Sequence, residues 1–279
     1  HVEVVAMLTR EVATLIEDYA PFSTGIEGDE LGLLVGEPQR EVTGVITCWS
    51  PTVVVLEQAV ACGANVILCH EPLTWGICGR DPEAGLKWYD ERHITAKVPN
   101  QRRLQLCLEN GLSVYRYHSN WDWAPVYGQV DMLVKRLSLG THIGGCRIAP
   151  VYEREPISVG ELARSACALL GIGPIRVIGD PERMVSRIAV THGGFGQMFT
   201  IPEVAADSGA ELAIFGEMLD YTIRYCVEID LAGIELGHCA SEQPGMEGMA
   251  QFLRERLSAE IPVECLNSGR PWTYLSAEG

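Results

Sequence analysis

Apolar strand patterns alternate with amphipathic helix patterns along most of the chain, and this alternation limits the fold more than any other feature. Residues 42–49 (VTGVITCW) are rich in β-branched side chains, which is typical of a strand. A helix pattern follows, which Ser50 and Pro51 open as N-cap and first helical residue and Gly63 closes. The apolar run at residues 65–70 predicts the next strand. Strands and helices in this order and spacing are typical of βαβ units over largely parallel sheets.

The same combination of capping residues, apolar periodicity and glycine stops recurs along the chain. It predicts helices at residues 5–19, 99–110, 129–138, 158–170, 200–208 and 217–231. It predicts further strands at residues 112–118, 146–152, 174–180, 187–193, 211–216, 234–238 and 262–267. Capping boxes are expected at Ser158 with Glu161 and at Thr200 with Glu203. The sequence therefore predicts an α/β fold with mostly parallel or mixed sheets.

Two parts of the chain resemble each other. Residues 63–73 (GANVILCHEPL) and 209–219 (GAELAIFGEML) share Gly, Ala, Glu and Leu in register. After the next predicted helix, residues 118–122 (HSNWD) and 238–242 (HCASE) both read His, three residues, carboxylate. Two matching pairs in the same order indicate two pseudo-duplicated βαβ lobes. We place one lobe at residues 1–127 with 236–279 and the other at residues 128–235.

The charge balance narrows the range of partners. The 279 residues include 21 Lys and Arg against 37 Asp and Glu, a net charge of −16, whereas nucleic-acid binding requires a basic surface. The longest apolar stretch, residues 53–69, is interrupted by polar side chains and falls short of the ~20 apolar residues that cross a bilayer. A basic segment followed by an apolar block, typical of a secretory signal, is not seen at the start. We expect a cytoplasmic protein that binds neither nucleic acid nor membranes.

The ten cysteines favour a packing role. They are scattered without a C-x-x-C pair, and most fall in apolar runs where a reduced thiol behaves as a small buried hydrophobe. A cysteine-based zinc or redox function is the least favoured hypothesis.

Histidines and carboxylates gather at the predicted ends of strands. Three pairs have a carboxylate one or four residues after the histidine: His70 with Glu71, His118 with Asp122, and His238 with Glu242. A lone histidine at a strand end is more often a hydrogen-bonded core residue, but strand ends converge at one edge of such a fold, so three pairs favour metal ligation. Imidazole and carboxylate ligands suit Zn, Mn or Fe. Five or six ligands exceed the needs of one tetrahedral ion, so we expect two ions sharing a bridging hydroxide, an arrangement that favours hydrolysis.

Other features allow two interpretations each. The glycine loop at residues 191–197 (THGGFGQ) either approaches a ligand closely or makes a tight turn. Glu217 takes the place that Glu71 holds in the repeat, and it either faces the same cavity or begins its helix as a favourable acid. Three tryptophans near the candidate ligands either wall a pocket or pack at a domain seam: Trp75, Trp121 and Trp123.

The order of several motifs resembles a known family. DELGLLVG (29–36), GANVILCHEPL, YHSNWD, GGFG and GHCASEQPGM stand in the order and rough spacing of the NIF-three-like family, also labelled type 2 GTP cyclohydrolase I. The resemblance extends from about residue 5 to residue 258. It implies a two-lobed α/β fold, a dinuclear metal centre between the lobes and a ring-shaped homohexamer.

The resemblance also implies a ligand set. The first His of the family's His-His-Pro motif falls on His70, the Asp that closes its His-Thr-Asn-x-Asp motif on Asp122, and its Gly-His-x-x-x-Glu pair on His238 and Glu242. Glu71 stands where the family usually has its second His; it can ligate through oxygen but makes the site harder. The expected cofactors are two divalent transition-metal ions, Fe, Mn or Zn.

The catalytic candidates are His118 and Glu71. By analogy His118 lies near the centre without being a ligand, so it is either a proton shuttle or hydrogen-bond partner, or a structural residue that orients Asp122. The expected activity is hydrolysis of a C–N or similar bond in a small molecule, cyclic substrates included. A triphosphate would need several local cations, for which the candidates are Arg80, Arg102, Arg103 and Arg116. The alternative is a non-catalytic metal-binding or protein-interaction module.

Overall fold

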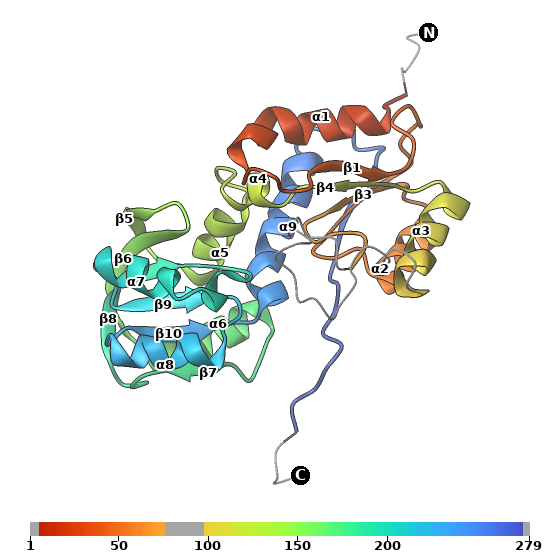
Figure 1. Cartoon of the computed structure of the whole chain (residues 1–279). Helices are drawn as coiled ribbons and strands as arrows, with labels where there is room; N and C mark the ends of the chain where they lie inside the picture. Colours follow the sequence, from red (N-terminus) through yellow and green to blue (C-terminus); the bar gives the residue numbers. More distant parts are fainter. Residues whose placement is uncertain (1–5, 76–97, 276–279) are drawn as a thin grey trace. The chain divides into compact units, whose positions relative to one another are not determined.

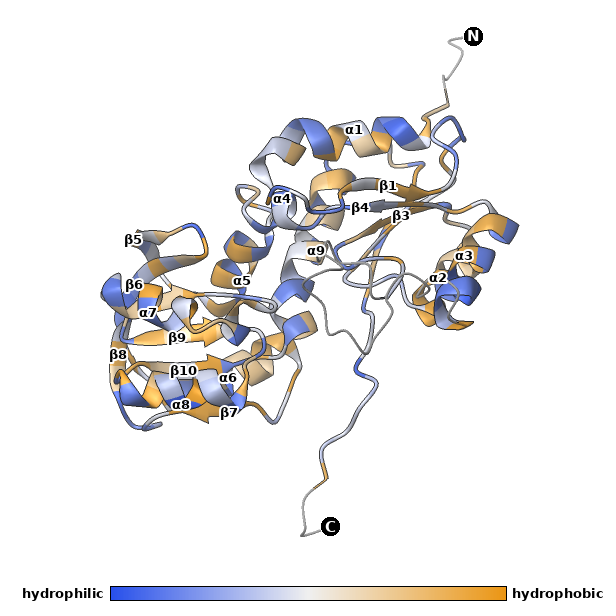
Figure 2. Cartoon of the chain, viewed as in Figure 1, coloured by the Kyte–Doolittle hydropathy of each residue, from blue (hydrophilic) through white to orange (hydrophobic). Residues whose placement is uncertain are grey.

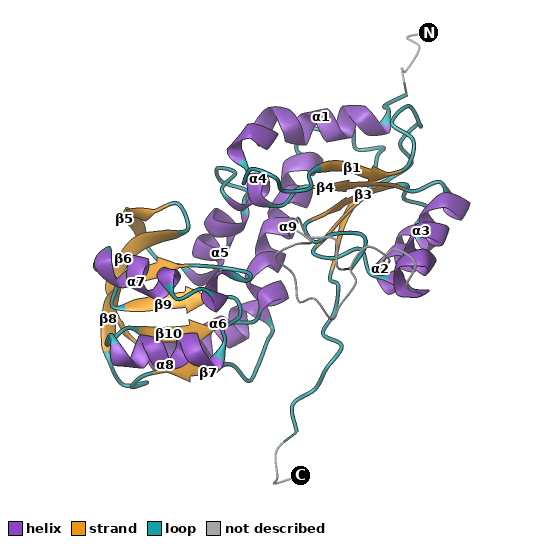
Figure 3. Ribbon diagram, in the orientation of Figure 1, coloured by secondary structure: helices purple, strands orange, loops and turns teal. Residues whose placement is uncertain are grey.

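The computed structural model describes residues 6–75 and 98–275. The chain divides into two compact units, His1–Tyr127 with Met246–Gly269 and Gly128–Gly245 with Arg270–Gly279 (Figure 1). Each unit contains one mixed sheet with helices packed on it (Figure 3). The predicted α/β class with mixed sheets is confirmed.

The first unit is a five-stranded sheet in the order β1-β4-β3-β2-β11. Its strands are β1 (Gly32–Val35), β2 (Val45–Cys48), β3 (Val66–Cys69), β4 (Ser113–Arg116) and β11 (Val263–Leu266). Its helices are α1 (Thr9–Tyr19), η1 (Phe22–Thr24), α2 (Val53–Ala61), α3 (Val98–Asn110), α4 (Ser119–Asp122) and the later turns of α9 (His238–Arg254). Neighbouring strands pair in parallel except β1, which is antiparallel to β4.

Both faces of this sheet are covered, which explains why β2, β3 and β4 are buried at every residue. Alternate residues of one strand serve opposite cores: Val45 packs with α1 and α9, while Ile46 packs with α2 and α3. The predicted cap of α2 is displaced by two residues. The Thr52 hydroxyl, rather than Ser50, accepts the hydrogen bond from the Val55 N–H.

The second unit is a six-stranded sheet in the order β5-β6-β8-β9-β10-β7. Its strands are β5 (Thr141–Cys146), β6 (Ala149–Ser158), β7 (Arg176–Ile178), β8 (Met184–Val190), β9 (Leu212–Phe215) and β10 (Ala232–Glu235). Its helices are α5 (Gln129–Leu137), α6 (Val159–Leu170), η3 (Phe195–Gln197), α7 (Thr200–Asp207), α8 (Asp220–Glu228) and the first turns of α9. Strands β8, β9 and β10 are parallel, and the other pairs are antiparallel. Figure 2 shows β9 as mainly hydrophobic.

The two units repeat one topology. In the first, β2-α2-β3-α3-β4 forms the parallel core and β1 adds antiparallel to β4. In the second, β8-α7-β9-α8-β10 does the same and β7 adds antiparallel to β10. The repeated sequence segments fall on β3 and β9, the central strands of the two cores. The ends of corresponding strands therefore occupy corresponding places.

Several expected elements differ. The single strand predicted at residues 146–152 is wrong, because the chain turns at residues 147–148 and forms the antiparallel hairpin of β5 and β6. Strand β5 is exposed and glycine-rich, so it carries none of the apolar alternation on which the prediction relied. The expected cap at Thr200 does not form, since α7 starts after Phe199 without a side-chain cap. The Ser158 cap is confirmed by its bond from the Glu161 N–H.

Among the described helices, none is both long enough and apolar enough to cross a bilayer.

Candidate metal centre

The first cluster consists of the candidate ligands His70, Glu71 and Asp122 together with the catalytic candidate His118. His70 follows β3 directly, and its N–H lies within hydrogen-bond distance of the Cys48 and Trp49 carbonyls. Parallel pairing of β3 with β2 thus holds the main chain at this strand end. The His70 side chain is completely buried.

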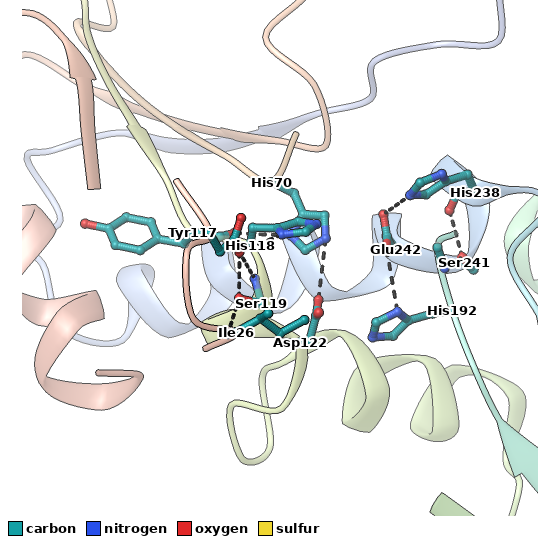
Figure 4. Close-up of polar contacts among 12 residues, drawn as sticks. Ile26, His70, Tyr117, His118, Ser119, Asp122, His192, His238, Ser241 and Glu242 are labelled. Carbon is teal, nitrogen blue, oxygen red and sulfur yellow. Dashed lines mark hydrogen bonds and ion pairs between the residues drawn. The ribbon is translucent and has the colours of Figure 1, made fainter. Parts of the chain in front are cut away.

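The His70 ring has a defined orientation. Its Nδ1 lies 3.1 Å from the carbonyl oxygen of Tyr117, which can only accept, so Nδ1 carries a proton, and in the neutral ring Nε2 holds the lone pair (Figure 4). Nε2 lies 3.5 Å from Oδ1 of Asp122. Two ligands of one tetrahedral ion, each bound at about 2.0–2.1 Å, are separated by about 3.4 Å. The spacing therefore suits two donors to the same ion.

A short helical turn presents Asp122. The N–H groups of Trp121 and Asp122 donate to the His118 carbonyl at 2.8 and 3.0 Å, which closes α4. His118 therefore positions Asp122 through its main chain. Its imidazole is in contact with His70, with ring centroids 4.6 Å apart, and His70, Glu71 and His118 each offer a ligand atom within 4.8 Å of the others.

Asp29, which sequence reasoning did not identify as a site residue, forms a hydrogen bond with the His118 side chain. His118 Nδ1 lies 2.8 Å from Asp29 Oδ2, and the Arg116 guanidinium donates to Oδ1 at 2.7 Å. Burial opposes ionisation of Asp29, but hydrogen bonds from His118 and Ser119 and the charge of Arg116 hold its pKa well below its usual range. The only sequence signal was its place at the start of the DELGLLVG motif.

The second cluster consists of His192, Glu217, His238 and Glu242. His238 and Glu242 lie four residues apart at the start of α9 and so share a helix face, with His238 Nε2 3.2 Å from Glu242 Oε2. His238 Nδ1 lies 3.1 Å from Oε1 of Glu217. The hydrogen bond from His238 lowers the pKa of Glu217. His238 thus has the same arrangement as His70: an acceptor on Nδ1 and a carboxylate facing Nε2.

His192 was missed by sequence reasoning. It lies two residues after β8, is buried, and has Nδ1 3.6 Å from Oε1 of Glu242 (Figure 4). The available signal was the one used for His70, a histidine at a strand end. The adjacent glycines directed the interpretation toward a loop instead.

The glycine loop turns at Gly193 and Gly194 and lies against two of the candidate metal-ligating side chains. Gly193 has φ +53°, its N–H donates to Ser241 Oγ at 3.0 Å, and a Cβ at this position would overlap Glu242 Oε1 and lie 3.1 Å from His238 Nε2. The loop therefore approaches the candidate ligands closely. Glu217 precedes α8, which begins at Asp220, and faces His238 rather than starting the helix.

The donor chemistry of both clusters fits a divalent transition metal. The donors are imidazoles and carboxylates, the ligands that suit Zn, Mn and Fe. His70 and His238 each have Nδ1 bonded to an oxygen acceptor, which is how metal-ligating histidines are commonly oriented.

Two of the three tryptophans and two of the arginines have partners within the first unit. Trp121 is completely buried in the first unit's core against Tyr19 and Phe252, so it packs rather than walls a pocket. Trp75 is partly exposed beneath the Arg103 guanidinium, 4.3 Å from the ring centroid. Arg102 pairs with the exposed Glu57 carboxylate. Arg80 lies outside the described residues.

The chain is thus a duplicated α/β protein. In each unit, histidine and carboxylate side chains that could bind a metal ion lie at the ends of strands. The sequence model of the Duf34/NIF3 family (NGG1p interacting factor 3) matches residues 7–270, and the chain belongs to this family.

Curated relatives and solved structures agree with this assignment. The chain is 27% identical over 264 residues to a Clostridium perfringens protein named GTP cyclohydrolase 1 type 2 homolog, covering 91% of this chain and 94% of the relative. It is 29% identical over 249 residues to the Escherichia coli K12 protein of the same name, covering 88% and 89%. A Bacillus cereus protein related to NIF3 has the same fold, with a TM-score of 0.79 at 18% identity, covering 97% and 99%.

Proposed function

We propose that this protein is a metal-dependent hydrolase that uses two divalent transition-metal ions, Fe, Mn or Zn. The observation that carries the proposal is the His70 and Asp122 pair: a fully buried imidazole with its proton directed to a carbonyl and Nε2 3.5 Å from a buried carboxylate. Burying an ionisable pair in this way is costly unless a cation or a hydrogen-bond network compensates it.

Each of the two clusters supplies the ligands of one ion. We assign His70 and Asp122 to one ion, with Glu71 beside His70 as a further oxygen ligand, and His238 with Glu242 to the other. When bound, divalent ions polarise an electrophilic group and lower the pKa of a water molecule toward 7. Glu217 fixes the His238 ring so that Nε2 faces the carboxylate of Glu242.

His118 is the residue best placed to move a proton. Its Nδ1 is engaged by Asp29, and the ring is partly exposed beside His70, so Nε2 is the nitrogen that would exchange a proton with a reacting group. Glu71, adjacent to His70 and half-buried, is the second candidate for this role, in addition to ligation.

The charges near the first cluster favour a small substrate. Of the arginines considered for phosphate binding, Arg116 is bonded to Asp29 and to main-chain carbonyls, and Arg103 donates to the Leu73 carbonyl. These cations are engaged within the protein, so the proposed reaction is hydrolysis of a C–N or similar bond in a small molecule, cyclic substrates included. The name of the curated relatives makes GTP ring opening the specific candidate to test against it.

A non-catalytic metal-binding or protein-interaction role is the second candidate. The observation in its favour is the family's description as an interacting factor. Turnover separates the two. The metal-reconstituted protein, incubated with a metabolite mixture and with GTP, should consume a substrate, and chelation should abolish the activity.

The matched variants are Asp122→Asn, which should lose the activity, and Glu30→Gln, an exposed acid whose loss should leave it intact. Activity that survives both chelation and Asp122→Asn would refute the proposal. Copurification of a protein partner without turnover would favour the second candidate. We further propose a cytoplasmic location and a homo-oligomer, a hexamer by family resemblance; sedimentation velocity tests the latter.

A further inference from the structure

Asp29 is engaged on both of its oxygens by groups of the first cluster or its neighbours. Oδ2 accepts from His118 Nδ1 at 2.8 Å, from the Ser119 N–H at 3.1 Å and from the Ser119 hydroxyl at 2.6 Å. Oδ1 accepts from Arg116 Nη1 at 2.7 Å. The carboxylate therefore receives four hydrogen bonds from three residues between the end of β4 and the start of α4.

This pattern determines which nitrogen of His118 holds a proton. An ionised carboxylate can only accept, so His118 Nδ1 must donate. In a neutral ring the lone pair then lies on Nε2. The ring packs against the ring of His70, whose neutral form likewise has its lone pair on Nε2.

The same network fixes the main chain around the cluster. Arg116 Nε donates to the His70 carbonyl at 2.9 Å, and Nη1 also donates to the Glu30 carbonyl at 2.7 Å. The Ile26 N–H donates to the Ser119 hydroxyl at 2.8 Å. The segment 26–30 is thereby tied to both His70 and the start of α4. A carboxylate needed only to neutralise Arg116 would use Oδ1 alone, whereas Oδ2 is given entirely to His118 and Ser119.

We infer that Asp29 is a positioning residue that holds His118 as the Nδ1-protonated tautomer and presents the Nε2 lone pair to the site. Asp29 bonds to His118, Ser119 and Arg116. His118 is the one of these that packs against the ring of His70, so Asp29 acts on the site through His118. Its significance for catalysis rests on the proposed function, but the tautomer is a property of the protein without metal.

The test is the ring-nitrogen NMR spectrum of uniformly ¹⁵N-labelled full-length protein, kept with a chelator at pH 8.5, above the ordinary histidine pKa of about 6.5. The His118 signals are assigned from their disappearance in His118→Gln. We expect a single tautomer with the proton on Nδ1 in the wild-type protein. Asp29→Ala should lose this Nδ1-proton signal, and Glu30→Gln, which removes a neighbouring exposed acid, should retain it.

Other results would overturn the inference. A proton on Nε2, or on both nitrogens, in the wild-type protein contradicts it without any variant, so it stays testable even if Asp29→Ala does not fold. An unchanged Nδ1-proton signal in a folded Asp29→Ala also contradicts it. Absence of the Nδ1-protonated tautomer from a wild-type protein with normal metal content refutes this inference alone. The expected tautomer in a wild-type protein that binds no metal refutes only the proposed function.

Discussion

Replacing Gly193 by alanine tests whether the glycine loop exists to let the main chain approach Glu242. Gly193 has φ +53°, where an L side chain costs about 1–2 kcal/mol. A Cβ there would also overlap Oε1 of the buried Glu242 carboxylate, and displacing packed groups costs about 1–3 kcal/mol. We expect Gly193→Ala to lower the free energy of unfolding by about 2–5 kcal/mol.

The matched control is Gly209→Ala. Gly209 has φ +81° but no atom within 4 Å of its would-be Cβ, so it bears only the conformational cost of about 1–2 kcal/mol. Urea denaturation of both variants without metal measures the difference. Because the added methyl must displace Glu242, we also expect Gly193→Ala to weaken Zn²⁺ binding, measured by calorimetry, by about 10–100-fold. Equal destabilisation by the two substitutions, with unchanged Zn²⁺ affinity, would refute the reasoning.

Three further predictions concern parts of the chain outside the clusters. Burial opposes ionisation of Glu211, but two backbone N–H groups and Arg187 lower its pKa, so its stabilising effect is present above the ordinary value of 4.5 and is lost as pH falls through the lowered pKa. In urea denaturation, Glu211→Gln should therefore be less stable than wild type at pH 6.5, with a smaller gap at pH 3.5; a constant gap would contradict this. Trp121→Ala should cost about 3–5 kcal/mol by the same method, and a cost below 1 kcal/mol would contradict its core position. Burial raises the pKa of the Cys69 thiol to about 12, so iodoacetamide at pH 8 should modify the exposed Cys62 first, and equal labelling in peptide mass spectra would count against this.

The sequence predicted the parallel cores because each buried strand is a continuous apolar run. Strands β3 and β9 are buried at every residue, and no polar side chain interrupts their apolar sequences. Helix α9 was not predicted because Pro244 and Gly245 interrupt its helical pattern. Pro244 lies six residues after the helix begins at His238, and the helix continues past it. Strand β5 escaped because an exposed edge strand does not need apolar alternation.

In the candidate site, likewise, residues close in sequence could be paired by prediction and residues far apart could not. His238 and Glu242 could be paired from sequence because four residues on a helix bring them together. Asp29 and His118 are 89 residues apart, and only the antiparallel addition of β1 beside β4 brings their segments together. No local pattern reports such a pairing. His192 had a strand-end signal, but a single histidine beside three glycines is explained equally well by a turn.

The measurement that tests the central claim most directly is the metal content of the purified protein. The full chain is reconstituted separately with Zn²⁺, Mn²⁺ and Fe²⁺ and freed of excess ion. Its metal content is then measured by inductively coupled plasma mass spectrometry. We predict two ions per chain for at least one metal, with a lower content in both Asp122→Ala and Glu242→Ala and an unchanged content in Glu30→Gln. A wild-type chain that retains no ion, or equal contents in wild type and both ligand variants, would contradict the account.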